Sequence, residues 1–293
     1  MDSVQSARLR LLAAAALFST GGAAIKACEL TPWQVASFRA GIGALALLVM
    51  VPKARSGWTW RTWVAGLPYA ATVITFCLAS RWTTSANAIF LQSTAPLYLL
   101  LLGPLLLREP VRRRDFGFLA ALAAGMALFF VGTEAPRATA PQPALGNAVA
   151  AVSGLTWALT MAGLRWISRS SPEPAGAAAA ATVAGNLLAF FVVLPMALPV
   201  ERSAPSDWAI LVFLGVFQIG AAYALVTRST AWVPALEATM LLLLEPVLNP
   251  LWSWAVHGET PGPWSAIGGA VILGATLARA LGRSRARPQG EGT

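Results

Sequence analysis

The chain has 293 residues, of which 57% are hydrophobic and only 11% are charged, and its formal net charge is +9. A soluble domain carries roughly 25% charged residues, so most of this surface must face something other than water. Apolar runs of about 20 residues, the length a helix needs to cross a bilayer, recur along the chain. The alternating segments of about ten residues that build a membrane β-barrel do not. The composition therefore predicts an all-α polytopic membrane protein.

The basic residues lie between the apolar runs rather than along one stripe. They therefore indicate membrane topology, and we expect no nucleic-acid partner. Cys28 and Cys77 fit neither a metal-ligand spacing nor a disulfide framework. The chain carries no P-loop or other ATP-binding signature, so we expect no cofactor, no metal and no ATP-driven step.

Ten apolar spans follow one another, separated mostly by short segments rich in Pro, Gly and charged residues. They are expected at Leu9–Ala27, Trp33–Val51, Thr62–Ser80, Thr84–Leu107, Asp115–Gly132, Gly146–Ile167, Ala175–Leu198, Asp207–Thr227, Val233–Val256 and Trp264–Leu281. The longest connection lies between the fifth and sixth spans and is rich in Pro and Ala. It predicts two halves, residues 1–135 and 146–293, joined by a linker at 136–145.

The two halves repeat one another at an interval of 150 residues. The matches that matter involve three less common residue types: Trp82 with Trp232, Pro96 with Pro246, and Glu109 with Glu259. Five spans separate each residue from its copy, so the halves must enter the membrane in opposite directions. This arrangement is an inverted-topology repeat, typical of secondary transporters with a central site where the halves meet. We therefore predict two inverted five-helix repeats around a central cavity.

An even number of spans places both termini on the same side of the membrane. If that side is cytoplasmic, the opposite loops hold only Lys26, Arg81, Arg137 and Arg202. The basic residues at the cytoplasmic ends are then Arg8, Arg10, Lys53, Arg55, Arg61, Arg108, Arg112, Arg113, Arg114, Arg165, Arg169, Arg228, Arg279, Arg283, Arg285 and Arg287. This imbalance follows the positive-inside rule and predicts cytoplasmic termini. The basic tail is expected to contact anionic lipid headgroups.

Several short motifs follow one another in order along the two halves. They are Thr31-Pro32 with Arg39, Pro96-Leu97, Glu109, Ala222-Tyr223, Glu245-Pro246-Val247, Gly258-Glu259, and the glycines Gly268, Gly269 and Gly274. With these motifs the whole chain resembles the drug/metabolite transporter superfamily, of the ten-helix EamA type. One departure is Ser19-Thr20-Gly21, where that family often has a Trp-Gly pair.

The resemblance implies a bowl of ten helices with a cavity lined by spans one, three, four, six, eight and nine. The overall pattern is similar to bacterial exporters of aromatic and other neutral amino acids. It implies a multi-pass protein of the bacterial inner membrane, with a periplasmic linker and a cytoplasmic tail.

Pro96 and Pro246 each remove a backbone donor in the middle of a span and free a carbonyl one turn back. In hydrocarbon this is tolerated only where protein or a water-filled cavity satisfies the freed group. Two readings stay open: packing kinks, or breaks that line the cavity and act as hinges.

Three charged residues within the spans are candidates for a functional role. Glu245 is near the middle of the ninth span, where an acid marks an ion, proton or substrate path unless it is a neutral carboxyl bonded to a neighbouring helix. Glu237 lies two turns earlier, nearer the cytoplasmic end. Arg39 either holds a substrate carboxylate bidentately, or snorkels to the interface or pairs with an acid such as Glu29.

The other candidates are aromatic or hydrogen-bonding side chains within the spans. A mainly apolar wall with a few polar groups suits a small amphiphilic ligand, although aromatic residues in membrane helices also face lipid or fill gaps. The expected cavity residues are Tyr69, Phe76, Phe90, Thr94, Tyr98, Trp157, Thr160, Gln218, Tyr223 and Asn249.

The leading hypothesis is a secondary transporter that exports amino acids with aromatic or apolar side chains by alternating access. Its partners are that substrate and membrane lipids; the small-residue tracts 120–125 and 268–274 pack helices within the fold or across a homodimer contact. The alternative within transport is a cationic-drug exporter with Glu245 as counter-charge. An intramembrane enzyme is disfavoured because His257 is the single histidine and no His-Glu-x-x-His is present. A receptor or channel would need a sensing domain or a filter-like segment.

Overall fold

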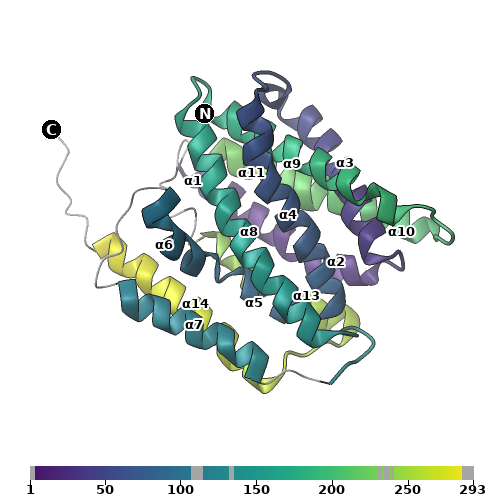
Figure 1. Cartoon of the computed structure of the whole chain (residues 1–293), viewed down its shortest axis with the longest axis vertical. Helices are drawn as coiled ribbons and strands as arrows, with labels where there is room; N and C mark the ends of the chain where they lie inside the picture. Colours follow the sequence, from purple (N-terminus) through teal and green to yellow (C-terminus); the bar gives the residue numbers. More distant parts are fainter. Residues whose placement is uncertain are drawn as a thin grey trace.

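The chain folds as a bundle of helices with the connections at its two ends (Figure 1). The structure is a computed structural model that describes residues 4–106, 115–131, 135–229, 233, 238 and 241–285. Within those residues the regular elements are helical, and one isolated bridge joins Arg137 to Ala140. Since lipid offers no hydrogen-bond partner, an apolar chain of this kind satisfies its backbone inside helices.

The first five spans begin and end close to where the apolar runs predict. They are α1 (Val4–Ser19) continued by α2 (Gly21–Ala27), α3 (Pro32–Met50), α4 (Trp60–Trp82), α5 (Ser85–Gln92) continued by α6 (Ala95–Leu106), and α7 (Asp115–Val131). A one-turn helix, η1 (Pro52–Arg55), follows α3. Thr31 begins α3 with a capping box to Gln34, and Pro32 occupies the first turn, where no backbone donor is needed.

The last five spans match the prediction in the same way. They are α8 (Pro143–Arg169), α9 (Pro174–Ala197), α10 (Pro205–Phe213) continued by the π-helix η2 (Leu214–Ala221) and α11 (Ala222–Ser229), the ninth span with α13 (Leu244–His257), and α14 (Pro263–Arg285). Apart from residues 233 and 238, the ninth span is described from residue 241 onward. Glu237, Glu109 and Trp232 lie outside the described residues.

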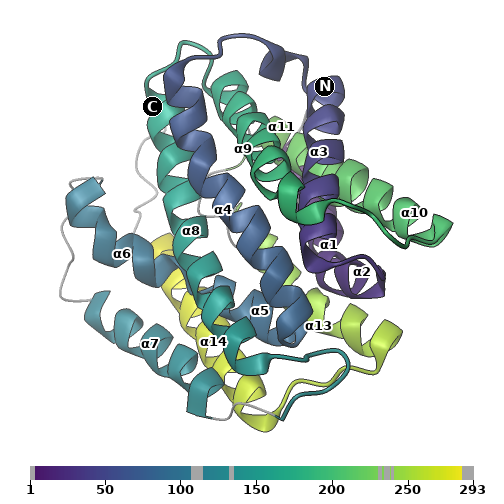
Figure 2. The same cartoon turned by 45° about the vertical axis from the view of Figure 1, so that its right-hand side comes forward.

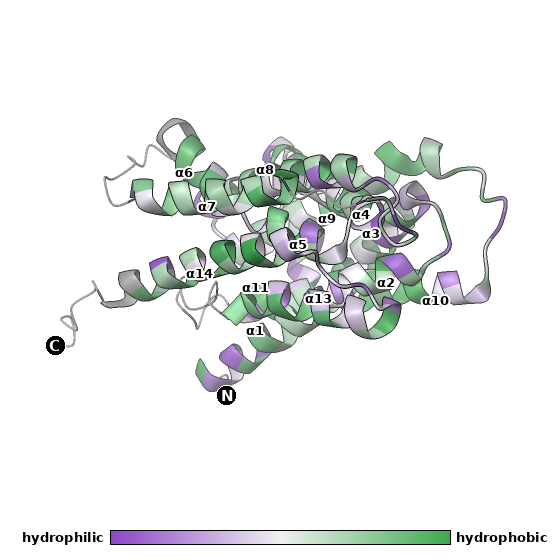
Figure 3. Ribbon diagram, turned by 90° about the horizontal axis from the view of Figure 1, so that it is seen from below, coloured by the Kyte–Doolittle hydropathy of each residue, from purple (hydrophilic) through white to green (hydrophobic). Residues whose placement is uncertain are grey.

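Length and hydropathy agree with membrane-spanning helices. Among the described residues, seven helical stretches are long and apolar enough to cross a membrane, and α7 is a shorter apolar helix of 17 residues. Large apolar side chains point outward along them, with Val49 70%, Val131 73% and Phe191 62% exposed. Figure 3 shows apolar residues along the helices and hydrophilic ones mostly at helix ends and in loops. In water such a surface would aggregate, whereas lipid covers it.

The packing of α3 against α9 shows that the two repeats are inverted. These are the second helices of their repeats, and they run antiparallel: Gln34 Nε2 donates to Ala197 O (3.1 Å), and Ser37 Oγ donates to Phe190 O (2.9 Å) further along. Other pairs exchange in the way a two-fold axis requires. Helix α4 packs on α8 and α9, while η2 and α11 pack on α1 and α3. The predicted fold class, ten helices in two inverted repeats, is confirmed.

Both predicted proline breaks are sharper than kinks. The fourth span leaves the helix at Ser93 and Thr94, just before Pro96 in the first turn of α6, and the ninth does so at Leu243, just before Pro246 in the first turn of α13. The Ser93 and Thr94 hydroxyls donate to Ile89 O (2.7 Å) and Leu91 O (2.6 Å), so the break leaves carbonyls satisfied inside the protein.

Helices α7 and α14, the fifth of each repeat, lie side by side at one edge of the bundle (Figures 1 and 2). They also run antiparallel, since Asp115 at the start of α7 pairs with Arg279 near the end of α14 at 2.8 Å. A Cβ on Gly268 would meet Gly125 O at 2.7 Å, so the backbones touch where the small-residue tracts face each other. These tracts pack helices within the fold.

Gly268→Ala should therefore push α7 and α14 apart. We expect overpacking to cost about 1–3 kcal/mol of stability, seen as a lower unfolding temperature in detergent. Gly274→Ala is the matched control, because it lies on the same helix with nothing within 4 Å of the added Cβ. An equal fall in both variants would contradict the close contact.

Candidate functional site

Two predicted tyrosines meet at the centre of the bundle. Tyr69 of α4 is 1% exposed and accepts a hydrogen bond from Asn186 Nδ2 of α9 (3.2 Å). Its ring centroid lies 5.5 Å from that of Tyr223 on α11, which in turn lies 5.1 Å from the ring of Phe18 on α1. We call these four residues together with Arg39 the central cluster: Phe18, Arg39, Tyr69, Asn186 and Tyr223. They come from both repeats.

Arg39 brings a buried positive charge to this cluster. It is 2% exposed, and its Nη2 donates to Val73 O of α4 at 3.0 Å. Among the described residues, its Nε and Nη1 have no hydrogen-bond partner. The alternatives that Arg39 snorkels to the interface or pairs with Glu29 are wrong, because Glu29 is exposed and Arg39 turns inward. A buried guanidinium with spare donors is costly unless something else binds it.

Glu245 lies in the first turn of α13. It is close enough to Tyr223 for the two side chains to interact electrostatically, and Arg39 also acts on Tyr223. A carboxyl and a guanidinium therefore both lie near the same tyrosine. The helix break at Leu243 sets this position, since α13 starts afresh just before Glu245.

Other predicted cavity residues lie elsewhere. Phe76 belongs to the main hydrophobic core, and Phe90 packs against Phe129 of α7 with ring centroids 6.2 Å apart. Thr94 Oγ1 and Tyr98 OH lie 3.9 Å and 3.6 Å from the sulfur of Met126, also on α7. Phe90, Thr94 and Tyr98 therefore lie where α5 and the start of α6 meet α7. The structure does not bring them to the central cluster.

Two further predicted residues, Thr160 and Trp157, lie on α8. Thr160 of α8 is fully buried, with its hydroxyl 3.2 Å from that of Thr72 on α4. Trp157 is half-buried one turn earlier on α8. Thr160 therefore lies at the interface of spans three and six.

Gln218 and Asn249 face the break in the first span. A Cβ on Gly21 would lie 2.9 Å from Gln218 Nε2, and one on Gly22 would lie 2.6 Å from Asn249 Oδ1 and 2.9 Å from Ser85 Oγ. Within the described part of the chain, Gln218 Oε1, both amide atoms of Asn249 and Ser85 Oγ are buried without a hydrogen-bond partner. Unpaired buried polar groups are rare in folded proteins and ask for an explanation. We call Ser85, Gln218 and Asn249 the amide layer.

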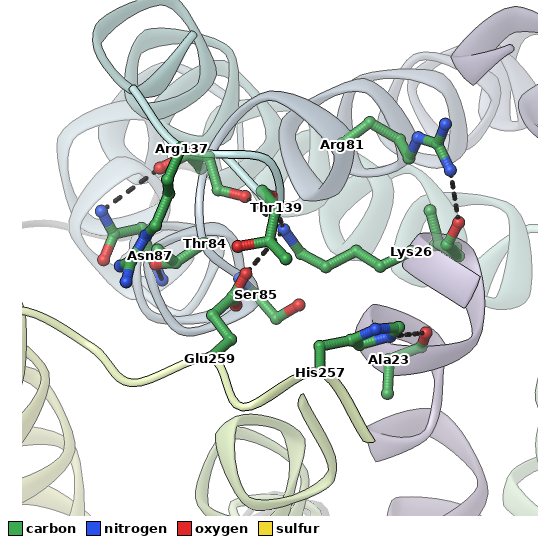
Figure 4. A network of polar contacts seen from close by, with 12 residues as sticks. Ala23, Lys26, Arg81, Thr84, Ser85, Asn87, Arg137, Thr139, His257 and Glu259 are labelled. Atoms are coloured by element: carbon green, nitrogen blue, oxygen red, sulfur yellow. Dashed lines mark hydrogen bonds and ion pairs between the residues drawn. The ribbon is translucent and has the colours of Figure 1, made fainter. Parts of the chain in front are cut away.

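A network that sequence reasoning missed closes one end of the bundle (Figure 4). Lys26 Nζ pairs with Glu259 Oε2 at 2.8 Å, with side chains 4% and 2% exposed. Lys26 also donates to Thr83 O (2.8 Å) and to Thr139 O, while Glu259 Oε1 accepts from Ser85 N at 2.6 Å. The topology had placed Lys26 and Glu259 on the same side, but nothing in the spacing indicated that they touch.

The other basic residues of that end serve the same network. Arg81 of α4 donates to Ile25 O (3.1 Å) and to Cys28 O, which closes the end of α2. Arg137 of the linker donates to Thr260 O at 3.0 Å. Lys26, Arg81 and Arg137 are three of the four basic residues on the side opposite the termini, and all three make local contacts there.

Asn147 joins three helices just beneath this network. Its Oδ1 accepts from Thr83 Oγ1 (2.7 Å) and Asn87 Nδ2 (3.0 Å), and its Nδ2 donates to Phe129 O (2.8 Å). Asn147 is fully buried, so α5, α7 and α8 meet through one amide.

Comparison with known proteins decides the family. The model of the EamA-like transporter family matches residues 6–131 and 144–279, one match for each repeat. The chain belongs to this family. A solved crystal structure that carries no functional description is 21% identical, with a TM-score of 0.64, and the match covers 97% of this chain and 100% of the other. That likeness shows the fold alone, and no curated protein matches.

As an EamA-like transporter, the chain is a membrane transporter of the drug/metabolite transporter superfamily. The central cluster, the amide layer and the closed end then lie along its first, second, third, fourth, seventh, eighth and ninth spans. Four of these spans are broken or irregular, at α1–α2, α5–α6, η2 and α13. In membrane transporters, interrupted helices are where binding sites are built.

Asn147→Leu should test the junction, because leucine keeps the volume of the side chain and removes its hydrogen bonds. We expect a loss of about 2–4 kcal/mol, since buried partners are left unsatisfied. The measurement is thermal unfolding in detergent. Ser170→Ala, an exposed hydroxyl that bonds only within its own helix, should change little. An unchanged unfolding temperature for Asn147→Leu would argue against the junction.

Proposed function

We propose that this EamA-like transporter exports small zwitterionic metabolites by alternating access, and that these are amino acids with aromatic or other neutral side chains. The observation that carries the proposal is the spare binding capacity of Arg39 beside the paired tyrosines. Its Nε and Nη1 are buried and unpaired among the described residues. A substrate carboxylate is the partner that such a fork fits best.

The rest of the central cluster supports the same class of substrate. Glu245 lies near Tyr223 and offers a counter-charge for an ammonium group. The rings of Phe18, Tyr69 and Tyr223 offer apolar and aromatic surface for a side chain. Arginine, acid and aromatic wall together match the three parts of an aromatic amino acid.

The proposed setting is the bacterial inner membrane. Both termini are cytoplasmic in this proposal, and the linker at 136–145 between the repeats of residues 1–135 and 146–293 is periplasmic. Support comes from the basic residues, since the exposed Lys53, Arg55 and Arg169 all lie at the end away from the linker. Membrane lipids and the substrate are the proposed partners. Homodimerisation needs neither of the small-residue tracts, because these face each other in one chain.

Export of cationic drugs is the second candidate, and the position of Glu245 near aromatic rings favours it. Arg39 disfavours a cationic substrate, because its own positive charge lies close to the same tyrosine. An intramembrane hydrolase finds no support in the geometry. His257 Nε2 donates to Ala23 O (2.8 Å), and Glu259, the acid nearest in sequence, is paired with Lys26.

Efflux from proteoliposomes loaded with labelled phenylalanine, tryptophan or leucine tests the proposal. We expect efflux by the wild type and at least about a tenfold lower rate for Arg39→Lys, because an ammonium cannot form the bidentate contact. Arg202→Lys, at an exposed loop position, is the control and should transport normally. No efflux of any neutral amino acid, with or without a proton gradient, would overturn the amino-acid proposal.

Glu245→Gln separates the two candidate substrate classes. It should abolish export of a cationic dye, which depends on the acid as its sole counter-charge, and only reduce export of a neutral amino acid that Arg39 also binds. The two transport rates are compared with the same preparation. A variant that loses amino-acid export and keeps dye export would contradict this assignment.

A further inference from the structure

A seam of polar contacts runs between the first span and α13. The three contacts are Trp252 Nε1 to Ser19 Oγ (2.9 Å), His257 Nε2 to Ala23 O (2.8 Å), and Lys26 Nζ to Glu259 Oε2 (2.8 Å). On the first span they are spaced by four and then three residues, so they lie along one helix face. One partner in each contact comes from the first repeat and the other from the second.

The outermost contact of this seam ties together four segments. Besides Glu259, Lys26 reaches Thr83 O at the end of α4 and Thr139 O of the linker. Glu259 in turn accepts from the backbone N–H of Ser85 at the start of α5. Gly258 directs the carboxylate there, because it ends α13 in the left-handed conformation (φ 64°) and turns the chain back.

Behind the seam lies the amide layer. A Cβ on Gly22 of the first span would meet both Asn249 and Ser85, and Ser253 lies one turn along α13 from Asn249. In the described part of the chain, the polar side-chain atoms of Ser85, Asn249 and Ser253 are buried and have no hydrogen-bond partner. Groups left dry in this way are expected to meet water or a solute in another state of the protein.

Helix α2 is built as a separate piece. It spans seven residues, Gly21–Ala27, and is cut from α1 at Thr20, whose hydroxyl donates back to Leu17 O (2.7 Å). Its far end is held by Arg81 and by Lys26. A short segment with a break at one end and an ion pair at the other can move without unfolding the span.

We propose that the seam is the gate at the linker end of the transporter and that it is closed in this structure. Breaking the Lys26–Glu259 pair lets α2 leave α13 and opens the amide layer to the solution on that side. The proposal rests on the transport function but not on the identity of the substrate. It assigns Lys26 and Glu259 as gating residues rather than substrate-binding ones.

A permanent brace is the competing explanation. A buried ion pair adds little to the stability of a fold, because the cost of desolvating both charges offsets much of their attraction. Such a pair is better suited to a contact that must be specific and must also break. The two explanations differ in whether Ser85 ever meets the solution.

The first test uses Ser85→Cys in a Cys28→Ala/Cys77→Ala background. The Ser85 hydroxyl has no partner within the described residues, and the contact to Glu259 uses the backbone N–H, so the substitution leaves the gate intact. A membrane-impermeant maleimide is added to spheroplasts without substrate, and labelling is timed. Adding Lys26→Met should speed labelling by at least about tenfold, which corresponds to about 1.4 kcal/mol.

Lys53→Met is the matched control. It breaks an ion pair of nearly the same length, Lys53 Nζ to Glu173 Oε2 at 2.9 Å, but that pair is 67% and 65% exposed and lies at the opposite end. Labelling of Ser85→Cys should stay at its basal rate. Equal labelling with Lys26→Met and without it, in protein that elutes as a single folded species, would overturn the gate.

The second test locks the seam. Lys26→Cys/Glu259→Cys is joined by a short bifunctional methanethiosulfonate, and efflux is measured before and after reduction. We expect transport to stop on cross-linking and to return with reductant. Unchanged transport by fully cross-linked protein would establish a permanent brace. If the amino-acid substrate is wrong, efflux is absent throughout, while the labelling result still stands.

Discussion

The absence of hydrogen-bond partners in lipid is the constraint on which this structure depends. Wherever the chain leaves the helical conformation within a span, nearby groups of the protein must bind the backbone donors and acceptors that are freed. Ser93 and Thr94 supply hydroxyls at the break between α5 and α6, and Thr20 does the same between α1 and α2. Charged groups serve where a helix ends: Glu259 caps α5 and Arg81 closes α2.

The duplication determines how the helices pack. Since the repeats are inverted, equivalent helices meet antiparallel, as α3 does with α9 and α7 with α14. The other contacts then exchange between the halves. Two-fold symmetry also packs α5 of the broken fourth span against α13 of the broken ninth span.

The sequence predicts the spans, the repeat and the linker because each depends only on apolar length and residue type. Side-chain direction was harder to predict. Helices that are apolar on all sides do not show which face turns inward, so Phe90 and Tyr98 were expected to line the same cavity as Tyr69, whereas they pack against side chains of α7. For Arg39 the sequence left open a substrate-binding role, a position at the interface and a pair with Glu29, and the structure shows it turned inward to Val73 O. The contact of Lys26 with Glu259 joins residues far apart in the chain, and no periodicity encodes it.

Symmetry also shows where the two halves have diverged. Ala95 precedes Pro96 in the first turn of α6, whereas Glu245 precedes Pro246 in the first turn of α13, so at this position the second repeat carries an acid and the first does not. The first span is cut into α1 and α2, whereas its counterpart α8 runs unbroken from Pro143 to Arg169. A scaffold needs only what the repeats share. A transporter must also distinguish one solute and one side of the membrane from the other, and these asymmetric features are where that distinction is available.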